Sequence, residues 1–359
     1  MFFGGKGSIG LDIGSSYIKA VKLKEAMGGY ELELFHVHPL PPELIVDGSI
    51  IDSLRLVGSL KNMIKTAGIK TKNAVISVSG HSSVIIKRIS LPEMTEEELS
   101  ESIKFEAEQY VPFDIEDVNL DFQIIGPKEE PGQMDVILVA VKKDVINEYI
   151  SVVKEAGLNP IIVDIGAFAL ENMYGINYEV ESDKNVALLN IGASTVNLII
   201  LKGGISVFTR DSSLGSNLHT EALQREFNIS YENAEKLKSG EPVENVSPED
   251  AMAVIESASE EIFNEIIRSF DYYRSTTVHE DISEVIISGG CSLIGNFVSM
   301  LAERTGIETK IIEPFRNIKI PRKLENANIV TNDKSYSLHD IAPMLAVAVG
   351  LALRRQGDR

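Results

Sequence analysis

The chain of 359 residues is long enough for two domains that each bury a sizeable core. Its formal net charge of −19 argues against a nucleic-acid partner bound through the phosphate backbone, and against adsorption to anionic lipid by charge alone. The single cysteine, Cys291, excludes a disulfide bond within the chain and fits a reducing compartment such as the cytosol.

Two segments bear on targeting. We expect no signal peptide, since residues 1–6 lead directly into the first predicted strand. The longest apolar run, residues 341–353, is shorter than the ~20 residues that a membrane-spanning helix needs, and we expect a buried helix there. A role at a membrane would then require a partner that holds the protein in place.

Residues 9–23 predict two short strands joined by a tight turn of small residues at 14–16. Such a turn lets backbone N–H groups approach an anion without obstruction by side chains. Asp12 ends the first strand and offers an oxygen ligand for Mg²⁺, and Lys19 on the second strand offers a charge for phosphate. Taken alone, the segment could equally be a plain β-hairpin with an exposed aspartate.

A second segment, residues 188–201, aligns on the first without gaps. Asn190 falls on Asp12, and Gly192 falls on Gly14. Two similar hairpins about half a chain apart suggest a duplicated, two-lobed protein in which each lobe offers one phosphate-binding turn to a shared cleft.

The segment between the hairpins predicts the rest of one α/β lobe, followed by an insert. A strand at 30–38, a helix at 52–67 and strands at 73–78 and 84–91 complete the lobe. We expect the insert at 91–159, with a helix that begins at a capping box on Thr95, two strands at 118–125 and 134–141, and a helix at 145–156. A strand at 160–164 and a helix at 166–174 lead out of the lobe.

The second lobe is predicted to contain three strands within 186–210 and helices at 217–227, 230–238 and 248–276. A strand at 285–288 then runs into Gly289 and Gly290 at the start of a helix at 293–303. Residues 314–332 are expected to be rich in loops.

Two further places suggest nucleotide binding. Paired glycines before a helix let a ribose or a flat ring lie against bare backbone, and a helix N-terminus favours a nearby phosphate. Glu235 and Lys238 share a helix face and could bracket a ribose and an adenine edge. Each feature alone could be an ordinary turn or an exposed charged pair. Neither a P-loop nor a strand followed by the Rossmann glycine pattern is present in the sequence.

The order of five motifs resembles the nucleotide signature of the superfamily of actin, sugar kinases and heat-shock ATPases. These motifs are Asp12-x-Gly-Ser, Asp164-Ile-Gly, Asn190-x-Gly-x-Ser-Thr, Ser288-Gly-Gly and residues 342–350. The insert resembles the repositioned subdomain of the division protein FtsA.

The closest resemblance is to the PilM family of type IV pilus assembly proteins. It is carried by Leu91-Pro, by residues 106–114 at the end of the insert helix, and by Gly215-Ser-Asn before a helix.

This resemblance implies an α/β, two-lobed actin-like ATPase fold of duplicated mixed-sheet domains with an FtsA-like 1C subdomain. Residues 1–90 would form subdomain 1A, completed by 160–184 and 341–359, and residues 91–159 would form 1C. Residues 185–340 would form the second lobe, in which 2A carries 2B at about 214–284.

The implied cofactors are ATP and Mg²⁺. The resemblance places at the phosphates Gly14, Ser15, Ser16, Lys19, Gly192, Ser194 and Thr195. It places along the nucleoside Asn217, Glu235, Lys238, Gly289 and Gly290. Asp12 would lie near Mg²⁺ directly or through a water, with Asp164 beside it.

Asn190 departs from the family-wide pattern, which has an acid at this position. An amide can orient a water molecule but cannot take a proton from it, nor match the charge of a carboxylate at Mg²⁺. We therefore expect ATP binding with weak or absent hydrolysis.

The implied role is that of a cytoplasmic scaffold peripheral to the inner membrane. It would bind the short cytoplasmic tail of PilN in the groove between 1A and 1C, and pilus motor or platform proteins and a second copy are further candidate partners. One alternative is an FtsA-like division ATPase, for which a linker and an amphipathic membrane helix should follow the last core helix. The other is a phosphotransferase or ATPase of the same fold, against which Asn190 weighs.

Overall fold

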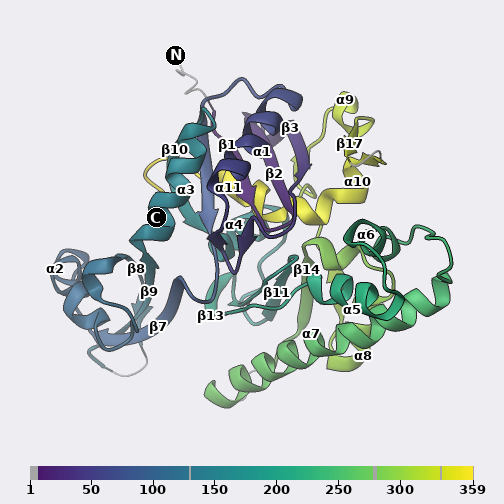
Figure 1. The fold of residues 1–359 in the computed structure, drawn as a ribbon. Coiled ribbons are helices and arrows are strands. Elements are labelled where there is room, and N and C mark those ends of the chain that lie inside the picture. Colours follow the sequence, from purple (N-terminus) through teal and green to yellow (C-terminus); the bar gives the residue numbers. More distant parts are fainter. Residues whose placement is uncertain (1–6, 129–130, 278–280, 332–333, 359) are drawn as a thin grey trace.

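The computed structural model describes residues 7–128, 131–277, 281–331 and 334–358, so the segment 1–6 lies outside the described residues. The chain forms two lobes and an insert that projects from the first lobe (Figure 1). Among the helices of these described ranges, none is long and apolar enough to cross a membrane.

A six-stranded sheet forms the centre of the first lobe. Its strand order is β10-β6-β1-β2-β3-β16, in which β1, β6 and β10 run parallel and the β1–β2–β3 meander is antiparallel. The bounds are β1 Ile9–Ile13, β2 Tyr17–Ala26, β3 Gly29–Pro39, β6 Asn73–Val78, β10 Asn159–Ile165 and β16 Ile318–Lys319.

Helices cover both faces of this sheet. α1 (Ser53–Thr66), capped by Asp52, packs with α3 (Lys143–Glu155) on one face. α4 (Gly166–Asn177) and α11 (Ala346–Leu353) pack together on the other. The two backbones are so close that a Cβ on Gly350 would lie 1.7 Å from the carbonyl oxygen of Ala169, so glycine is required there. The short hairpin of β4 (Ile45–Val46) and β5 (Ser49–Ile50) precedes α1.

The second lobe repeats this topology. Its sheet has the order β13-β12-β11-β14-β15, again a three-stranded antiparallel meander followed by two parallel strands. The bounds are β11 Asn185–Ile191, β12 Val196–Lys202, β13 Ile205–Ser212, β14 Glu284–Ser288 and β15 Thr309–Ile311. The shared strand order agrees with the duplication that the two hairpins predict.

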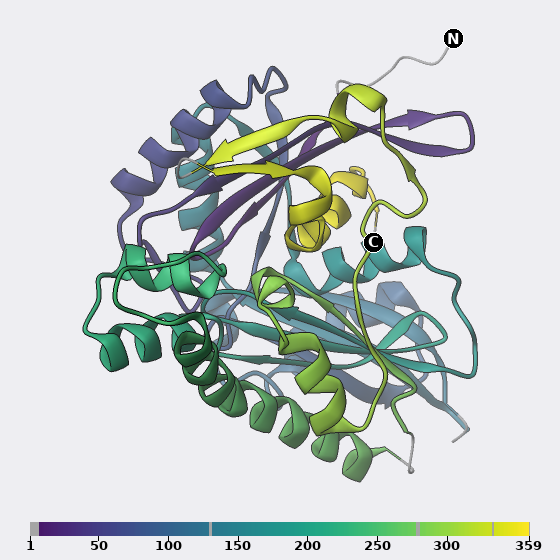
Figure 2. The same cartoon turned by 90° about the vertical axis from the view of Figure 1, so that its right-hand side faces the viewer.

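The helix α7 (Pro248–Thr276) runs along the side of the second lobe that faces away from the first lobe, and α5 (Asn217–Phe227) and α6 (Tyr231–Lys238) lie between α7 and the first lobe (Figure 1 and Figure 2). The remaining C-terminal elements are divided between the lobes: the first of them packs on the core of the second lobe, and the other four pack on the first lobe. They are α8 Phe297–Thr305, α9 Arg322–Glu325, β17 Asn328–Thr331, β18 Lys334–Ser337 and α10 Leu338–Ile341.

The insert has its own sheet and core. Its strands β7 (Val84–Pro92), β9 (Gln133–Lys142) and β8 (Val118–Pro127) pair in that order. α2 (Glu96–Ala107) begins at the capping box on Thr95, as predicted, and buries its apolar face against this sheet.

The packing places the boundaries of the insert differently from the predicted 91 and 159. β7 already belongs to the insert sheet, so the insert begins near Val84. α3 buries Tyr149 and Val153 in the core of the first lobe, so the insert ends near Lys142. The difference arises because no change in the sequence pattern shows that β7 pairs with the insert sheet or that α3 packs on the first lobe.

The predicted helix at 293–303 is also corrected. Residues Gly290–Leu293 form a short 3-10 turn, and α8 begins only at Phe297. Asn296 adopts a left-handed conformation, with φ of 62°, which separates the turn from the helix. Gly289 therefore precedes a 3-10 turn that begins at Gly290, and neither glycine lies at the N-terminus of an α-helix.

Candidate functional site

The turns of the two hairpins meet where the lobes touch. Each turn is closed in the same way: the Gly14 N–H donates to the carbonyl of Tyr17 at 3.1 Å, and the Gly192 N–H donates to that of Thr195 at 2.9 Å. Between the lobes, the hydroxyl of Ser194 donates to that of Ser15 at 2.8 Å. Two turns 178 residues apart in sequence thus face one another at one point of the molecule.

The first hairpin carries a cross-strand ion pair. Asp12 and Lys19 are opposite each other in the β1–β2 register, and the Lys19 Nζ lies 3.0 Å from an Asp12 carboxylate oxygen. Both side chains are 16% exposed, so the pair is shielded but still accessible. A Cβ on Gly14 would lie 2.9 Å from the Lys19 Nζ, so glycine at this position leaves the space in which the ammonium sits against the turn.

This donor set fits a metal–phosphate group. One carboxylate, one ammonium and several hydroxyls match Mg²⁺ that is held by one carboxylate, by waters and by phosphate oxygens. In the part of the chain that the structure describes, no group of three or more His, Cys, Asp or Glu could hold a metal ion alone.

The second hairpin carries amides at the equivalent positions. Asn190 and Asn197 are opposite each other in the β11–β12 register, and the Asn190 amide donates to the Asn197 side-chain oxygen at 3.2 Å. The Asn190 side-chain oxygen accepts a bond from the Ser288 hydroxyl at 3.3 Å. Asn190 is thus positioned by its neighbours but carries no charge.

The N-terminus of α5 holds the second turn in place. The Ser216 N–H donates to the Gly192 carbonyl at 3.0 Å, and the Asn217 N–H donates to the Ala193 carbonyl at 2.8 Å. A Cβ on Gly215 would lie 2.5 Å from that Ala193 oxygen, so glycine permits the contact. Asn217 therefore lies beside the turn of the second hairpin.

Glu235 and Lys238 form an ion pair on α6, and both bond Thr220 of α5. The Thr220 hydroxyl donates to Glu235 at 2.5 Å and accepts from the Lys238 ammonium at 2.9 Å. The first residue of the same helix, Tyr231, hydrogen-bonds Ser16 of the first turn, and burial raises its pKa to about 12. The Glu235–Lys238 pair therefore lies on a helix that contacts the first lobe.

Gly289 lies against the end of β11. Its φ is +86°, and a Cβ there would lie 2.3 Å from the Ile191 carbonyl oxygen, whereas a Cβ on Gly290 would meet nothing within 4 Å. Cys291, which follows, is fully buried, and burial raises its pKa to about 12. This cysteine packs in the core of the second lobe.

Asp164 lies on the third parallel strand of the first sheet, where it is opposite Ser77 of β6. Its carboxylate is 2.9 Å from the Arg354 Nε and accepts the backbone N–H of Ile165 at 2.8 Å. Burial raises its pKa, and the Arg354 guanidinium opposes that shift. The structure thus gives Asp164 an ion-pair partner from the end of α11, and its predicted place near Mg²⁺ stays a prediction.

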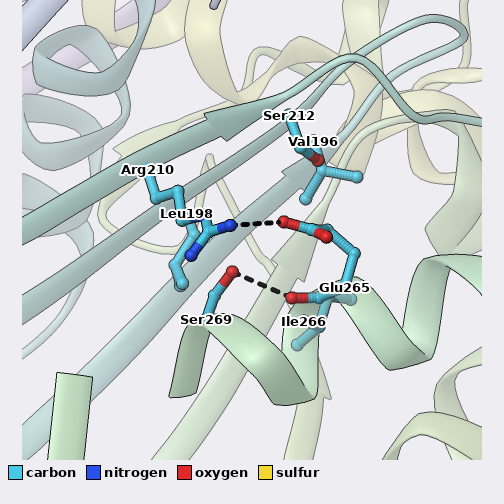
Figure 3. Close-up of a pocket in the computed structure, with 7 residues that line it drawn as sticks. All are labelled: Val196, Leu198, Arg210, Ser212, Glu265, Ile266 and Ser269. Atoms are coloured by element: carbon cyan, nitrogen blue, oxygen red, sulfur yellow. Dashed lines mark hydrogen bonds and ion pairs between the residues drawn. The ribbon is translucent and has the colours of Figure 1, made fainter. Parts of the chain in front are cut away.

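A small cavity in the second lobe is unrelated to these residues (Figure 3). It lies between β12, β13 and α7, and Arg210 and Glu265 form an ion pair of 3.1 Å at its edge. Its volume of about 10 Å³ has room for about one water molecule.

Sequence reasoning missed three residues beside the predicted site: Asn197, Thr220 and Tyr231. Asn197 follows Asn190 by seven residues, as Lys19 follows Asp12, so the alignment of the two hairpins already places it on Lys19. Thr220 and Tyr231 had no comparable signal, because their positions depend on how α5 and α6 pack against the first lobe.

Comparisons with known proteins bear on the family and the fold of the chain. The sequence matches the family of the type IV pilus assembly protein PilM over residues 10–356. The structure is similar to one described as the PilM-PilN type IV pilus biogenesis complex, with 26% identity, a TM-score of 0.82 and coverage of 97% of this chain and 98% of that chain. It is less similar to the ethanolamine utilization protein EutJ from Carboxydothermus hydrogenoformans, with 15% identity, a TM-score of 0.57 and coverage of 96% and 89%.

These matches confirm the two-lobed, actin-like α/β fold that the motifs predict. Because the family match extends over nearly the whole length, the chain belongs to the PilM family of type IV pilus assembly proteins.

Proposed function

We propose that this protein is a nucleotide-gated scaffold of type IV pilus assembly, which binds ATP between its lobes and holds the cytoplasmic tail of PilN. The observation that carries the nucleotide part is the contact of the two similar turns through Ser15 and Ser194, with the Lys19 ammonium beside it. Hydroxyls, an ammonium and small-residue turns are the groups that hold phosphates in proteins.

A triphosphate between the turns would replace the Ser15–Ser194 hydrogen bond with bonds from each hydroxyl to phosphate oxygens. Lys19 would stabilise the added charge, and Asp12 would hold Mg²⁺ directly or through a water. Thr220, Glu235 and Lys238 would face the nucleoside from α5 and α6. Bound Mg²⁺ would neutralise phosphate charge, and the residues of the chain would bind and orient the nucleotide.

Turnover should be slow, because the second hairpin offers an amide where a carboxylate would activate water. Asn190 is held by Asn197 and Ser288, which keeps its side chain oriented. An oriented amide can position water, but it cannot accept the proton. Long-lived nucleotide binding suits a switch or a scaffold better than an enzyme.

The PilN part of the proposal is supported by the similar structure, which is described as a PilM–PilN complex. We place the PilN tail in the groove between the first lobe and the insert, as an extended peptide with apolar side chains. Binding there would hold the protein at the inner membrane through its partner.

Thermodynamic linkage between ATP binding and binding of the PilN tail provides a test of the gate. If ATP and the tail favour the same arrangement of the lobes, each must strengthen the binding of the other by the same factor, typically about 5- to 150-fold. A synthetic peptide with the cytoplasmic residues of the cognate PilN should be titrated by calorimetry with and without saturating Mg-ATP. Tighter peptide binding with Mg-ATP would support the gate. Equal affinities would leave a scaffold without a gate.

A thermal melt provides the control for nucleotide binding itself. Mg-ATP at a hundred times its Kd should add ~2.7 kcal/mol to the free energy of unfolding. Protein freed of co-purified nucleotide that shows an unshifted midpoint would contradict the nucleotide site.

A further inference from the structure

A row of polar side chains crosses the second-lobe sheet at the level of Asn190. In the strand register, Asn190 is opposite Ser288 on β14 and opposite Asn197 on β12, and Asn197 is opposite Asp211 on β13. The bonds follow the same path: Ser288 donates to Asn190, Asn190 donates to Asn197, and Asn197 hydrogen-bonds the Asp211 carboxylate. Four strands are thus connected by side chains in one line.

One end of the row lies at the nucleotide site. Asn190 stands two residues before Gly192, at the end of the strand that enters the second phosphate turn. A Cβ on Gly289 would lie 3.0 Å from the Asn190 side-chain oxygen, so the glycine pair also borders this end. A displacement of the turn at 192–195 would therefore also displace Asn190.

The other end lies where the second lobe meets the first. Asp211 accepts the backbone N–H of Gly80, in the loop between β6 and β7. Two residues after Asp211, just beyond the end of β13, the Ser213 hydroxyl donates to the Asp47 carboxylate at 2.8 Å. A Cβ on Gly80 would lie 2.6 Å from the Asp47 carbonyl oxygen, so these segments are in backbone contact. The carboxylate of Asp211 thus joins a tightly packed contact between the lobes.

This contact is also the root of the insert. The Gly80 carbonyl accepts the N–H groups of Ser83 and Val84, each at 3.1 Å, where β7 begins. The Ser83 carbonyl accepts the N–H of Lys142 at 3.1 Å, where β9 ends. The start of β7 and the end of β9, which connect the insert to the first lobe, are therefore both hydrogen-bonded to the loop that contains Gly80 and Ser83. β7 also packs against β13 of the second lobe.

We propose that Asp211 is a positioning residue that couples the nucleotide site to the insert, through Asn197 and Asn190 on one side and through Gly80 on the other. The inference rests on the proposed nucleotide site and adds a path from that site to the insert. Burial raises the pKa of Asp211, whereas the bonds from Asn197 and Gly80 lower it, so the carboxylate depends on both partners.

Hydrogen exchange of the full-length protein tests this path, with Mg-ATP as the probe. In the wild type, Mg-ATP should slow exchange both in the turns at 14–16 and 192–195 and at the insert root, residues 79–84, by about threefold or more. In Asp211→Asn, which keeps the size of the side chain, Mg-ATP should still protect the turns, while the root should respond by less than about 1.5-fold.

The matched control is Glu265→Gln, which neutralises a shielded carboxylate on the opposite face of the same sheet (Figure 3). In Glu265→Gln, Mg-ATP should still slow exchange both in the two turns and at residues 79–84. Asn197→Ala, which interrupts the row at its centre, should repeat the loss at the root and serves if Asp211→Asn does not fold in a thermal melt.

The outcomes separate the two proposals. A wild type without protection at either place removes the nucleotide site and this inference with it. If Mg-ATP slows exchange in the two turns of the wild type but not at residues 79–84, the nucleotide site stands and the coupling is overturned. An unchanged root response in the folded Asp211→Asn variant overturns the role of Asp211.

Discussion

The two hairpins have the same backbone but different chemistry. In the first, Asp12 and Lys19 face each other as an ion pair 3.0 Å apart. In the second, the equivalent positions hold Asn190 and Asn197, joined by an amide hydrogen bond of 3.2 Å. A duplicated scaffold thus supplies two turns of one shape, of which one is flanked by a charged side-chain pair and the other by a neutral pair.

The largest expected effect comes from removing the cation of the charged hairpin. Lys19→Ala should weaken ATP binding by about 10- to 150-fold, because a hydrogen bond to a charged group contributes about 1.5–3 kcal/mol. Adenosine binding should change much less. Calorimetry with both ligands measures the difference, and equal losses for ATP and adenosine would show that Lys19 does not bind phosphate.

Making the neutral hairpin acidic should raise turnover. Asn190→Asp restores a group that can accept a proton from water, so steady-state phosphate release should rise by about tenfold or more over the wild type. Asn190→Ser, which offers no carboxylate, is the matched control and should gain nothing. If the aspartate variant hydrolyses ATP no faster, the amide is not the reason for slow turnover.

Making the charged hairpin neutral should remove a metal ligand. In Asp12→Asn the ammonium of Lys19 keeps a polar partner, while Mg²⁺ loses its carboxylate. The gain in ATP affinity on adding Mg²⁺ should fall by about tenfold, in the range expected for a lost metal contact. ATP titrations with Mg²⁺ and with a chelator measure this gain, and a gain equal to that of the wild type would place Mg²⁺ elsewhere.

The smallest effect distinguishes the glycines of the two turns. A Cβ on Gly14 would lie 2.9 Å from the Lys19 Nζ, whereas one on Gly192 would lie 3.5 Å from its nearest neighbour, the Thr195 carbonyl oxygen. Gly14→Ala should therefore displace the ammonium and weaken ATP binding by about threefold, or about 0.6 kcal/mol. Gly192→Ala should cost less. The reverse order would show that the lysine's place at the turn is unimportant.

Local patterns predicted the elements well, because they depend on neighbours in sequence. The two hairpins and the capping box on Thr95 follow from residue type and spacing. The boundaries of the insert and the start of α8 were harder, since α3 joins the first lobe through Tyr149 and the left-handed Asn296 delays the helix.

Partners that are distant in sequence were not predictable. The ion pair of Asp164 with Arg354 depends on how α11 crosses the first sheet, and the expected place of Asp164 near Mg²⁺ stays a prediction. Tyr231 reaches Ser16 only because the lobes meet, and Asp211 reaches Gly80 for the same reason. Sequence periodicity carries no information about such contacts between lobes.

The central claim is that both turns hold one triphosphate. A crystal structure with Mg²⁺ and a non-hydrolysable ATP analogue tests it most directly. We expect phosphate oxygens between the turns at 14–16 and 192–195, with the Ser15 and Ser194 hydroxyls bonded to phosphate in place of their present 2.8 Å contact. A nucleotide whose phosphates touch only one turn, with the Ser15–Ser194 bond intact, would contradict the claim.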